Sequence, residues 1–109
     1  MTRSNMQVVN CSTSAQYFHV IRRQMHRTFR KPLIVVAPKK MLRLKDAGSE
    51  ISEFDAGLRF KRVISNENST AVSDDKIRKL VLCSGQVYYD LVKAREETKS
   101  NDVAIVRIE

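Results

Sequence analysis

The sequence is poor in several residue types that mark particular classes of protein. Its 109 residues include two cysteines, no tryptophan, three glycines and two prolines. Cys11 and Cys83 lie on separate apolar stretches, which predicts buried free thiols in a reducing compartment, and with only two histidines there is no zinc-ligand pattern. No apolar run approaches the roughly 20 residues that a membrane-spanning helix requires. No membrane segment is therefore expected.

Acidic residues are absent from the first 45 positions, which contain ten Lys and Arg residues. The remaining positions contain ten Lys and Arg residues against twelve acids, so the formal net charge of +8 arises entirely in the first part. A run this basic fits a targeting peptide, a nucleic-acid-binding helix or one face of a helix in an α/β protein. With 42% apolar and 29% charged residues, the composition is typical of a globular domain or of two partial domains.

The first 37 residues predict a strand, a helix and a second strand. "MQVVN" before Cys11 is rich in β-branched residues and favours a short strand. Thr13 to Gln16 fits a capping box, in which the Thr13 hydroxyl accepts a first-turn N–H and the Gln16 side chain reaches back to the cap. The helix that follows is expected to end at Pro32 and to bury a stripe formed by Tyr17, Ile21, Met25 and Phe29.

The segment "LIVVA", residues 33–37, has the composition of a buried parallel strand. Strand, helix and strand together form a βαβ unit, for which a cleavable targeting peptide has no use. Residues 38–44 predict a loop or short helix. Residues 45–75 are rich in polar residues and have little periodicity beyond a possible short strand at Arg62 to Ile64, so we expect a linker or a surface crossing.

The last part of the chain predicts a second βαβ unit. Its expected elements are a strand at Lys79 to Cys83, a helix that buries Val87, Leu91 and Ala94, and a strand at Val103 to Ile108. A tight turn at Ser84-Gly85 joins the first strand to the helix. This position suits a phosphate-binding turn, but a single glycine more often serves the close approach of helix and strand.

The residues that could take part in catalysis or metal binding do not form a recognisable catalytic site. His19 and His26 lie two helical turns apart, too far to share a metal ion, and His19 is interpreted as a packing residue. The basic residues are candidates for binding an anion or for forming a subunit interface: Arg22, Arg23, Arg27, Lys39 and Arg43. A stand-alone basic module that binds nucleic acid or another polyanion is therefore an alternative reading of the chain.

Four blocks follow one another in the sequence: "NMQVVNCSTSAQYFHVIRRQM", "FRKPLIVVAPKKMLR", "KLVLCSGQVYYDL" and "DVAIVRIE". Together they resemble the first, thiamine-diphosphate-dependent component of the 2-oxoglutarate dehydrogenase complex. The resemblance implies an α/β fold in which residues 1–44 end a transketolase-like pyrimidine-binding domain. Residues 45–75 are then a linker or surface crossing, and residues 76–109 begin the C-terminal α/β domain. Some blocks look equally similar to the close 2-oxoadipate-acting branch.

The resemblance also implies an activity for the parent protein, a step of the tricarboxylic acid cycle. Members decarboxylate a 2-oxo acid on thiamine diphosphate, which magnesium holds, and pass the acyl group to a lipoyl arm. None of the family's catalytic, cofactor or metal residues can be placed on this sequence, so the segment alone is expected to be inactive and to bind neither cofactor. In two places it departs from the family pattern, with Ser14 in place of a proline and Leu44 in place of a histidine.

The expected partners are the remainder of the parent enzyme, the lipoyl-bearing acyltransferase and the dihydrolipoyl dehydrogenase. A homo-oligomer is expected, and neither a membrane nor a specific nucleic acid is expected as a partner. The implied location is the mitochondrial matrix in a eukaryote or the cytoplasm in a bacterium.

Overall fold

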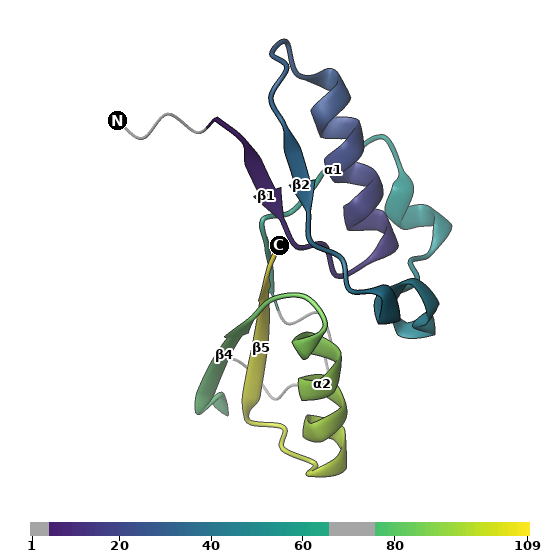
Figure 1. The fold of residues 1–109 in the computed structure, drawn as a ribbon. Helices are drawn as coiled ribbons and strands as arrows, with labels where there is room; N and C mark the ends of the chain where they lie inside the picture. The colour runs from purple at the N-terminus through teal and green to yellow at the C-terminus, as the bar shows by residue number, and fades with distance from the viewer. Residues whose placement is uncertain (1–4, 66–75) are drawn as a thin grey trace. The chain divides into compact units, whose positions relative to one another are not determined.

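The computed structural model describes residues 5–65 and 76–109 of the chain (Figure 1). Its Cα positions divide into two compact units, Met1–Lys61 and Arg62–Glu109. Within the described residues, no helix has both the length and the apolar character needed to cross a membrane.

The first unit is built on a parallel strand pair with a connecting helix. Strand β1 (Gln7–Val9) pairs with β2 (Leu33–Val35), and α1 (Ser14–His26) joins them. The predicted βαβ unit is thereby confirmed. The helix is shorter than expected, because Arg27 already has extended backbone angles, with φ −75° and ψ 143°. The prediction that α1 continues to Pro32 is therefore wrong.

The predicted apolar stripe of α1 does not face inward. The four stripe residues expose 40–69% of their surface, and the helix buries other positions instead: Ala15, Gln16, His19 and Val20. Successive residues of a helix lie 100° apart, so the stripe residues within α1, which are Tyr17, Ile21 and Met25, lie roughly half a turn away from this buried face. Small and hydrogen-bonded residues line the buried face because backbone segments approach the helix closely there.

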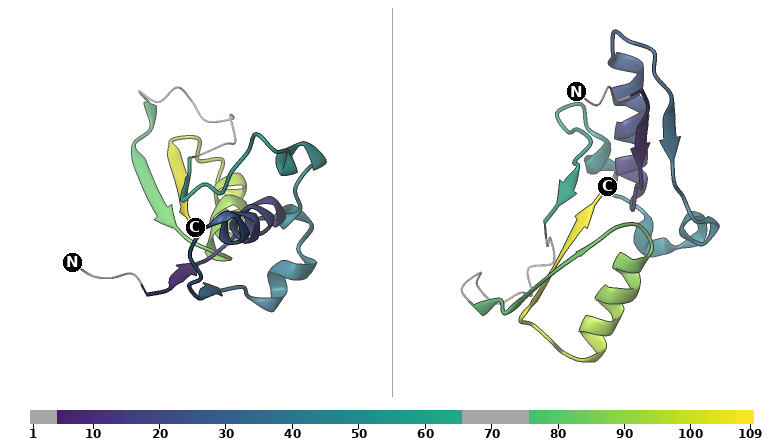
Figure 2. Two further views of the ribbon diagram at one scale, coloured as in Figure 1. Left: turned by 90° about the horizontal axis from the view of Figure 1, so that it is seen from above. Right: turned by 60° about the vertical axis from the view of Figure 1, so that its left-hand side comes forward.

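Three 3₁₀ turns follow β2: η1 (Lys39–Arg43), η2 (Lys45–Ala47) and η3 (Ile51–Phe54). The first confirms the short helix expected in residues 38–44. Turn η3 lies alongside α1 (Figure 2), where the Phe18 and Phe54 rings meet edge to face at 5.4 Å between centroids. The described first part of the predicted linker, residues 45–61, thus packs on the helix, and residues 66–75 lie outside the described residues.

A small apolar cluster holds the first unit together. It contains Val9, Cys11, Val20 and Phe60, and Leu33 and Val35 of β2 pack against it. Val20 has no exposed surface at all. The cluster therefore joins both strands, the helix and the end of the 45–61 segment.

The described residues of the second unit form a three-stranded sheet with one α-helix. Its strands are β3 (Val63–Ile64), β4 (Lys79–Cys83) and β5 (Val103–Ile108), and α2 (Val87–Glu97) follows β4. The strand order is β3-β5-β4, with β4 parallel and β3 antiparallel to β5. The second βαβ unit and the short strand near residues 62–64 are both confirmed.

Helix α2 contacts β5 through side chains other than those predicted. Val87 and Ala94 are exposed and Leu91 is only half-buried, so the expected buried face is wrong. The Arg107 guanidinium lies 4.2 Å from the centroid of the Tyr88 ring, and Arg95 donates to the Val103 carbonyl at 3.4 Å. The long side chains of Arg95 and Arg107 span the distance between α2 and β5. The aliphatic side chains of α2 are therefore less buried than predicted.

Candidate functional site

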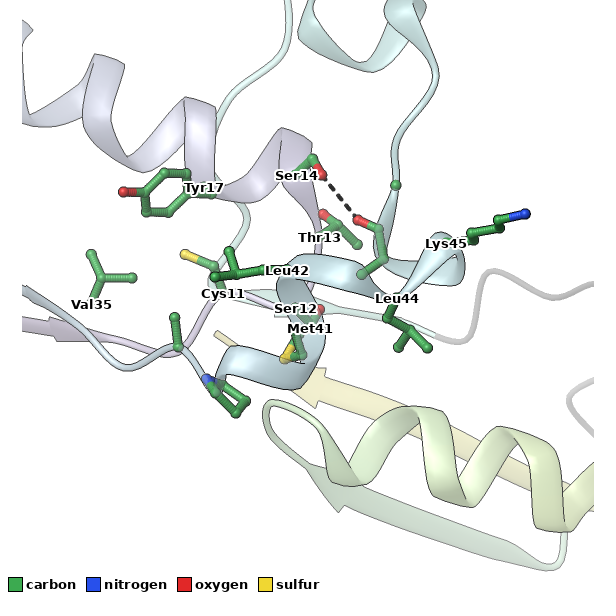
Figure 3. A pocket seen from close by; sticks show the side chains of 14 residues that line it. Cys11, Ser12, Thr13, Ser14, Tyr17, Val35, Met41, Leu42, Leu44 and Lys45 are labelled. Carbon is green, nitrogen blue, oxygen red and sulfur yellow. Dashed lines mark hydrogen bonds between the residues drawn. The ribbon is translucent and has the colours of Figure 1, made fainter.

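A pocket of about 480 Å³ lies at the carboxyl ends of β1 and β2 (Figure 3). In α/β folds this edge of a parallel sheet is where ligands usually bind. Cys11 and Ser12 enter the pocket after β1, Ala37 and Pro38 after β2, and η1 and η2 supply most of the rest of the wall. The lining is mainly apolar: Tyr17, Val35, Ala37, Pro38, Met41, Leu42, Leu44 and Ala47.

The N-terminus of α1 borders this pocket, but its donors are already engaged. Thr13 caps the helix, and its hydroxyl oxygen accepts the Gln16 N–H at 3.3 Å. The Ala15 N–H donates to the Ser49 hydroxyl oxygen at 3.0 Å, and the Ser14 hydroxyl donates to the Ala47 carbonyl at 3.2 Å. Anion binding at a helix N-terminus requires unpaired N–H groups. The arrangement therefore favours an apolar occupant of the pocket over a phosphate.

Gln16 makes an unforeseen contact. Its side-chain amide donates to the Lys61 carbonyl at 2.6 Å and its oxygen accepts the Lys61 N–H at 3.0 Å. The prediction that Gln16 reaches back to the helix cap is therefore wrong, although the Thr13 half of the capping box is confirmed. A buried amide requires partners for both of its ends, and Lys61 supplies both through its own N–H and carbonyl.

His19 is a packing residue, as predicted. It is buried, its Nε2 lies 2.7 Å from the Glu53 carbonyl oxygen, and its ring contacts Phe18 edge to face. A carbonyl can only accept, so Nε2 carries a proton and donates it to this bond. Over residues 5–65 and 76–109, no group of three His, Cys, Asp or Glu residues is arranged to hold a metal ion.

Two of the basic candidate residues make contacts within the first unit. Arg22 donates to the Leu58 carbonyl and, at 3.4 Å, to the Asp55 carbonyl. Arg23 donates to Gln7 Oε1 at 3.2 Å and lies 4.5 Å from the centroid of the Phe60 ring. These contacts give both guanidinium groups a structural role. As binding or interface residues they remain predictions.

The other three candidates lie at the surface of the first unit. Arg27 lies 5.2 Å from the Phe29 ring centroid, and Lys39 and Arg43 are exposed on η1. The structure thus places the five basic residues on two elements, α1 and η1, without gathering them into one site.

Both cysteines are free thiols in the structure, and Cys11 is buried. Cys83 is half-buried at the end of β4, and burial raises the pKa of its thiol above the ordinary value of 9.0, with the charge of Arg107 opposing the shift. A raised pKa makes a thiol a poor nucleophile near neutral pH. Gly85, two residues further on, has a φ of 62°, a conformation that permits the tight turn into α2.

Comparison with known proteins gives two consecutive matches. Residues 48–109 match the family described as "2-oxoglutarate dehydrogenase C-terminal", and residues 1–45 match "Transketolase, pyrimidine binding domain". The chain belongs to the 2-oxoglutarate dehydrogenase family. The resemblance inferred from the four sequence blocks and the α/β fold assigned to them are thereby confirmed.

Relatives within the family cover nearly the whole chain. It is 48% identical over 105 residues to the "2-oxoglutarate dehydrogenase E1 component" of Cupriavidus necator, and 48% identical over 106 residues to "2-oxoglutarate dehydrogenase-like, mitochondrial" of Rattus norvegicus. The E1 component of Brucella anthropi is 46% identical over 112 residues. Each match covers 96% of this chain and 10 or 11% of the relative. The chain thus spans about a tenth of the length of these curated relatives.

The family matches and the structure divide the chain at different places. The C-terminal family match begins at residue 48, whereas the first compact unit continues to Lys61. Residues 48–61 therefore match the second family region and pack in the first unit. The sequence did not predict their contacts with α1, which include the bond from the Ala15 N–H to the Ser49 hydroxyl and the contact of His19 with the Glu53 carbonyl.

Proposed function

We propose that this chain is a segment of a 2-oxoglutarate dehydrogenase E1 component. The observation that carries the proposal is the succession of the two family matches in one chain, with 48% identity to an E1 component over 96% of its length. The parent enzyme decarboxylates 2-oxoglutarate in the tricarboxylic acid cycle and transfers the acyl group to a lipoyl group. The polyanion-binding alternative gains no support from these matches.

The parent uses thiamine diphosphate, and magnesium holds the diphosphate. The described residues do not fit either group. The pocket beside α1 is mainly apolar, its neighbouring helix donors are engaged, and the described residues offer no metal-ligand cluster. We propose that other parts of the parent hold both groups and that the isolated chain has no decarboxylase activity.

The proposed organisation follows the sequence. Residues 1–44 end the pyrimidine-binding domain, residues 45–75 connect the domains, and residues 76–109 begin the C-terminal domain. The exposed residues Lys39 and Arg43 and the half-buried Arg27 then lie at interfaces with the rest of the parent.

The proposed partners are the remainder of the parent protein, the lipoyl-bearing acyltransferase and the dihydrolipoyl dehydrogenase, and the parent is a homo-oligomer. One relative has a name that places it in the mitochondrion and others are bacterial. The proposed location is accordingly the mitochondrial matrix in a eukaryote and the cytoplasm in a bacterium.

A chimeric enzyme tests the proposal. This chain replaces the matching region of the Cupriavidus necator E1 component, and release of carbon dioxide from 2-oxoglutarate and from 2-oxoadipate is measured with thiamine diphosphate and magnesium. We expect the chimera to act on 2-oxoglutarate and the isolated chain to be inactive. A soluble, folded chimera without activity would contradict the proposal, and activity of the isolated chain would contradict the assignment of the catalytic groups to other parts.

A further inference from the structure

The sheet of the second unit has one covered face and one open face. Ile105 and Arg107 of β5 are only 2% and 5% exposed, and Arg107 lies over the Tyr88 ring of α2. Helix α2 contacts β5 and lies next to it in Figure 1. Large aliphatic residues at alternate positions are 48–62% exposed: Val63, Leu80, Leu82 and Ile108.

The register of the strands places these exposed residues on a single face. Leu80 lies opposite Ala104, Leu82 opposite Val106, and Val63 opposite Ile108. Cross-strand partners point to the same side of a sheet, and successive residues point to opposite sides. We call this surface the open face; it consists of Val63, Leu80, Leu82, Ala104, Val106 and Ile108.

The dimensions of the open face fit one helix. Three strands at spacings of about 4.8 Å make a surface roughly 10 Å wide, and an α-helix with its side chains is about 10–12 Å in diameter. Ala104, on the central strand β5, is only 5% exposed, so the exposed surface of the open face comes from its larger neighbours; a helix would approach most closely at this small residue. Parallel strand pairs are as a rule covered by helices on both faces.

A second copy of the chain fits the open face less well. Four partly exposed aliphatic side chains give a patch of a few hundred Å², whereas a standard interface buries about 800 Å² on each partner. The relatives are about ten times as long as this chain, so the parent has ample polypeptide to supply a helix.

We propose that the open face binds an amphipathic helix from another part of the parent protein. This inference rests on the proposed function. The helix presents apolar residues at positions i, i+3, i+4 and i+7 to the open face. The sheet is then enclosed between α2 and this second helix.

Thiol labelling in two contexts tests the proposal. The variant Leu82→Cys is prepared in the isolated chain and in the chimeric E1 component, and labelling of position 82 by N-ethylmaleimide is followed by peptide mass spectrometry. We expect labelling at least about tenfold slower in the chimera, because a residue packed under a helix reacts only when the structure opens locally. Lys93→Cys, exposed on α2, is the matched control and should react equally fast in both.

Equal labelling rates at position 82 in the two contexts, with the control unchanged, would overturn the proposal. Protection already present in the isolated chain and lost on dilution would also overturn it, since a second copy would then be the occupant. Labelling is independent of catalysis. An inactive chimera that protects position 82 contradicts the proposed function alone, and an active chimera that leaves it reactive contradicts the helix alone.

Discussion

The helices of the two units differ in how they are held against their strands. Helix α1 buries four residues, and two of them, Gln16 and His19, bond to the backbone of residues 45–61. Helix α2 buries none, and its contacts with β5 include the Arg107–Tyr88 pair and the Arg95 bond to the Val103 carbonyl. In this chain, the helix against which residues 45–61 pack, α1, is the better buried of the two.

This difference predicts where substitutions will matter. Interior substitutions on α1 should remove buried apolar contacts and leave buried polar groups without partners. Equivalent substitutions on α2 should change surface that is already in contact with solvent.

The largest expected effect is that of Val20→Ala. Val20 is fully buried in the core cluster of the first unit, and its truncation should cost about 2 kcal/mol in the free energy of unfolding through lost burial and the cavity left behind. Urea unfolding followed by far-ultraviolet circular dichroism measures the change. Val87→Ala on α2, a residue 54% exposed, is the matched control and should stay within about 0.5 kcal/mol of the unsubstituted chain. Equal losses of stability for Val20→Ala and Val87→Ala would contradict the difference in burial between the two helices.

Gln16→Ala should destabilise the first unit by about 1–2 kcal/mol. The substitution leaves the Lys61 N–H and carbonyl without their bonds to the Gln16 side chain, and a buried polar group without a partner is costly. The same urea titration measures the effect. Gln24→Ala removes one exposed bond to the Lys31 carbonyl and should cost far less. A Gln16→Ala variant as stable as Gln24→Ala would show that residues 45–61 do not hold α1.

Thr13→Ala should cost about 1 kcal/mol, because the Thr13 hydroxyl caps α1. Gln86 occupies the corresponding position of α2 and makes no side-chain capping bond, so Gln86→Ala should have almost no effect. Amide hydrogen exchange in the first turn of each helix checks both substitutions. Faster exchange is expected in α1 only, and faster exchange in both helices would contradict the assignment of the caps.

The smallest expected effect concerns pH. Arg78 donates to Asp102 at 2.6 Å and lowers the pKa of that carboxyl below the ordinary value of 3.8. Because the folded-state pKa is depressed, the stabilisation is present above pH 3.8 and is lost as the pH falls through the lowered pKa. Titration of Asp102 by nuclear magnetic resonance should give a midpoint below 3.8. In the Arg78→Gln variant the midpoint should return toward that value, and an unchanged midpoint would exclude Arg78 as the cause.

Local sequence patterns predicted the elements well. The β-branched runs at Gln7–Val9, Lys79–Cys83 and Val103–Ile108 became strands at or close to the predicted bounds, and the Thr13 cap marked the start of α1. Strand positions and helix caps depend on residues that are close together in the chain, so the sequence alone is sufficient to predict them. Both βαβ units followed from the same reasoning.

The buried faces of the helices could not be predicted in this way. The stripe that begins at Tyr17 has the most apolar periodicity of α1, yet Gln16 and His19 are buried because a segment about 35–45 residues later supplies carbonyl partners. Helical periodicity identifies an apolar face without identifying what covers it. The pocket wall was missed for the same reason, since η1 and η2 come from two segments predicted as a loop or short helix (residues 38–44) and as a linker or surface crossing (residues 45–75).

The central claim is that this chain is part of a larger fold and leaves apolar surfaces that the parent covers. The most direct measurement combines sedimentation velocity with amide hydrogen exchange on the isolated chain. We expect concentration-dependent association or fast exchange in β1, β2, β4 and β5, because aliphatic residues on these strands remain exposed. A monodisperse monomer with slow exchange across all four strands would contradict it.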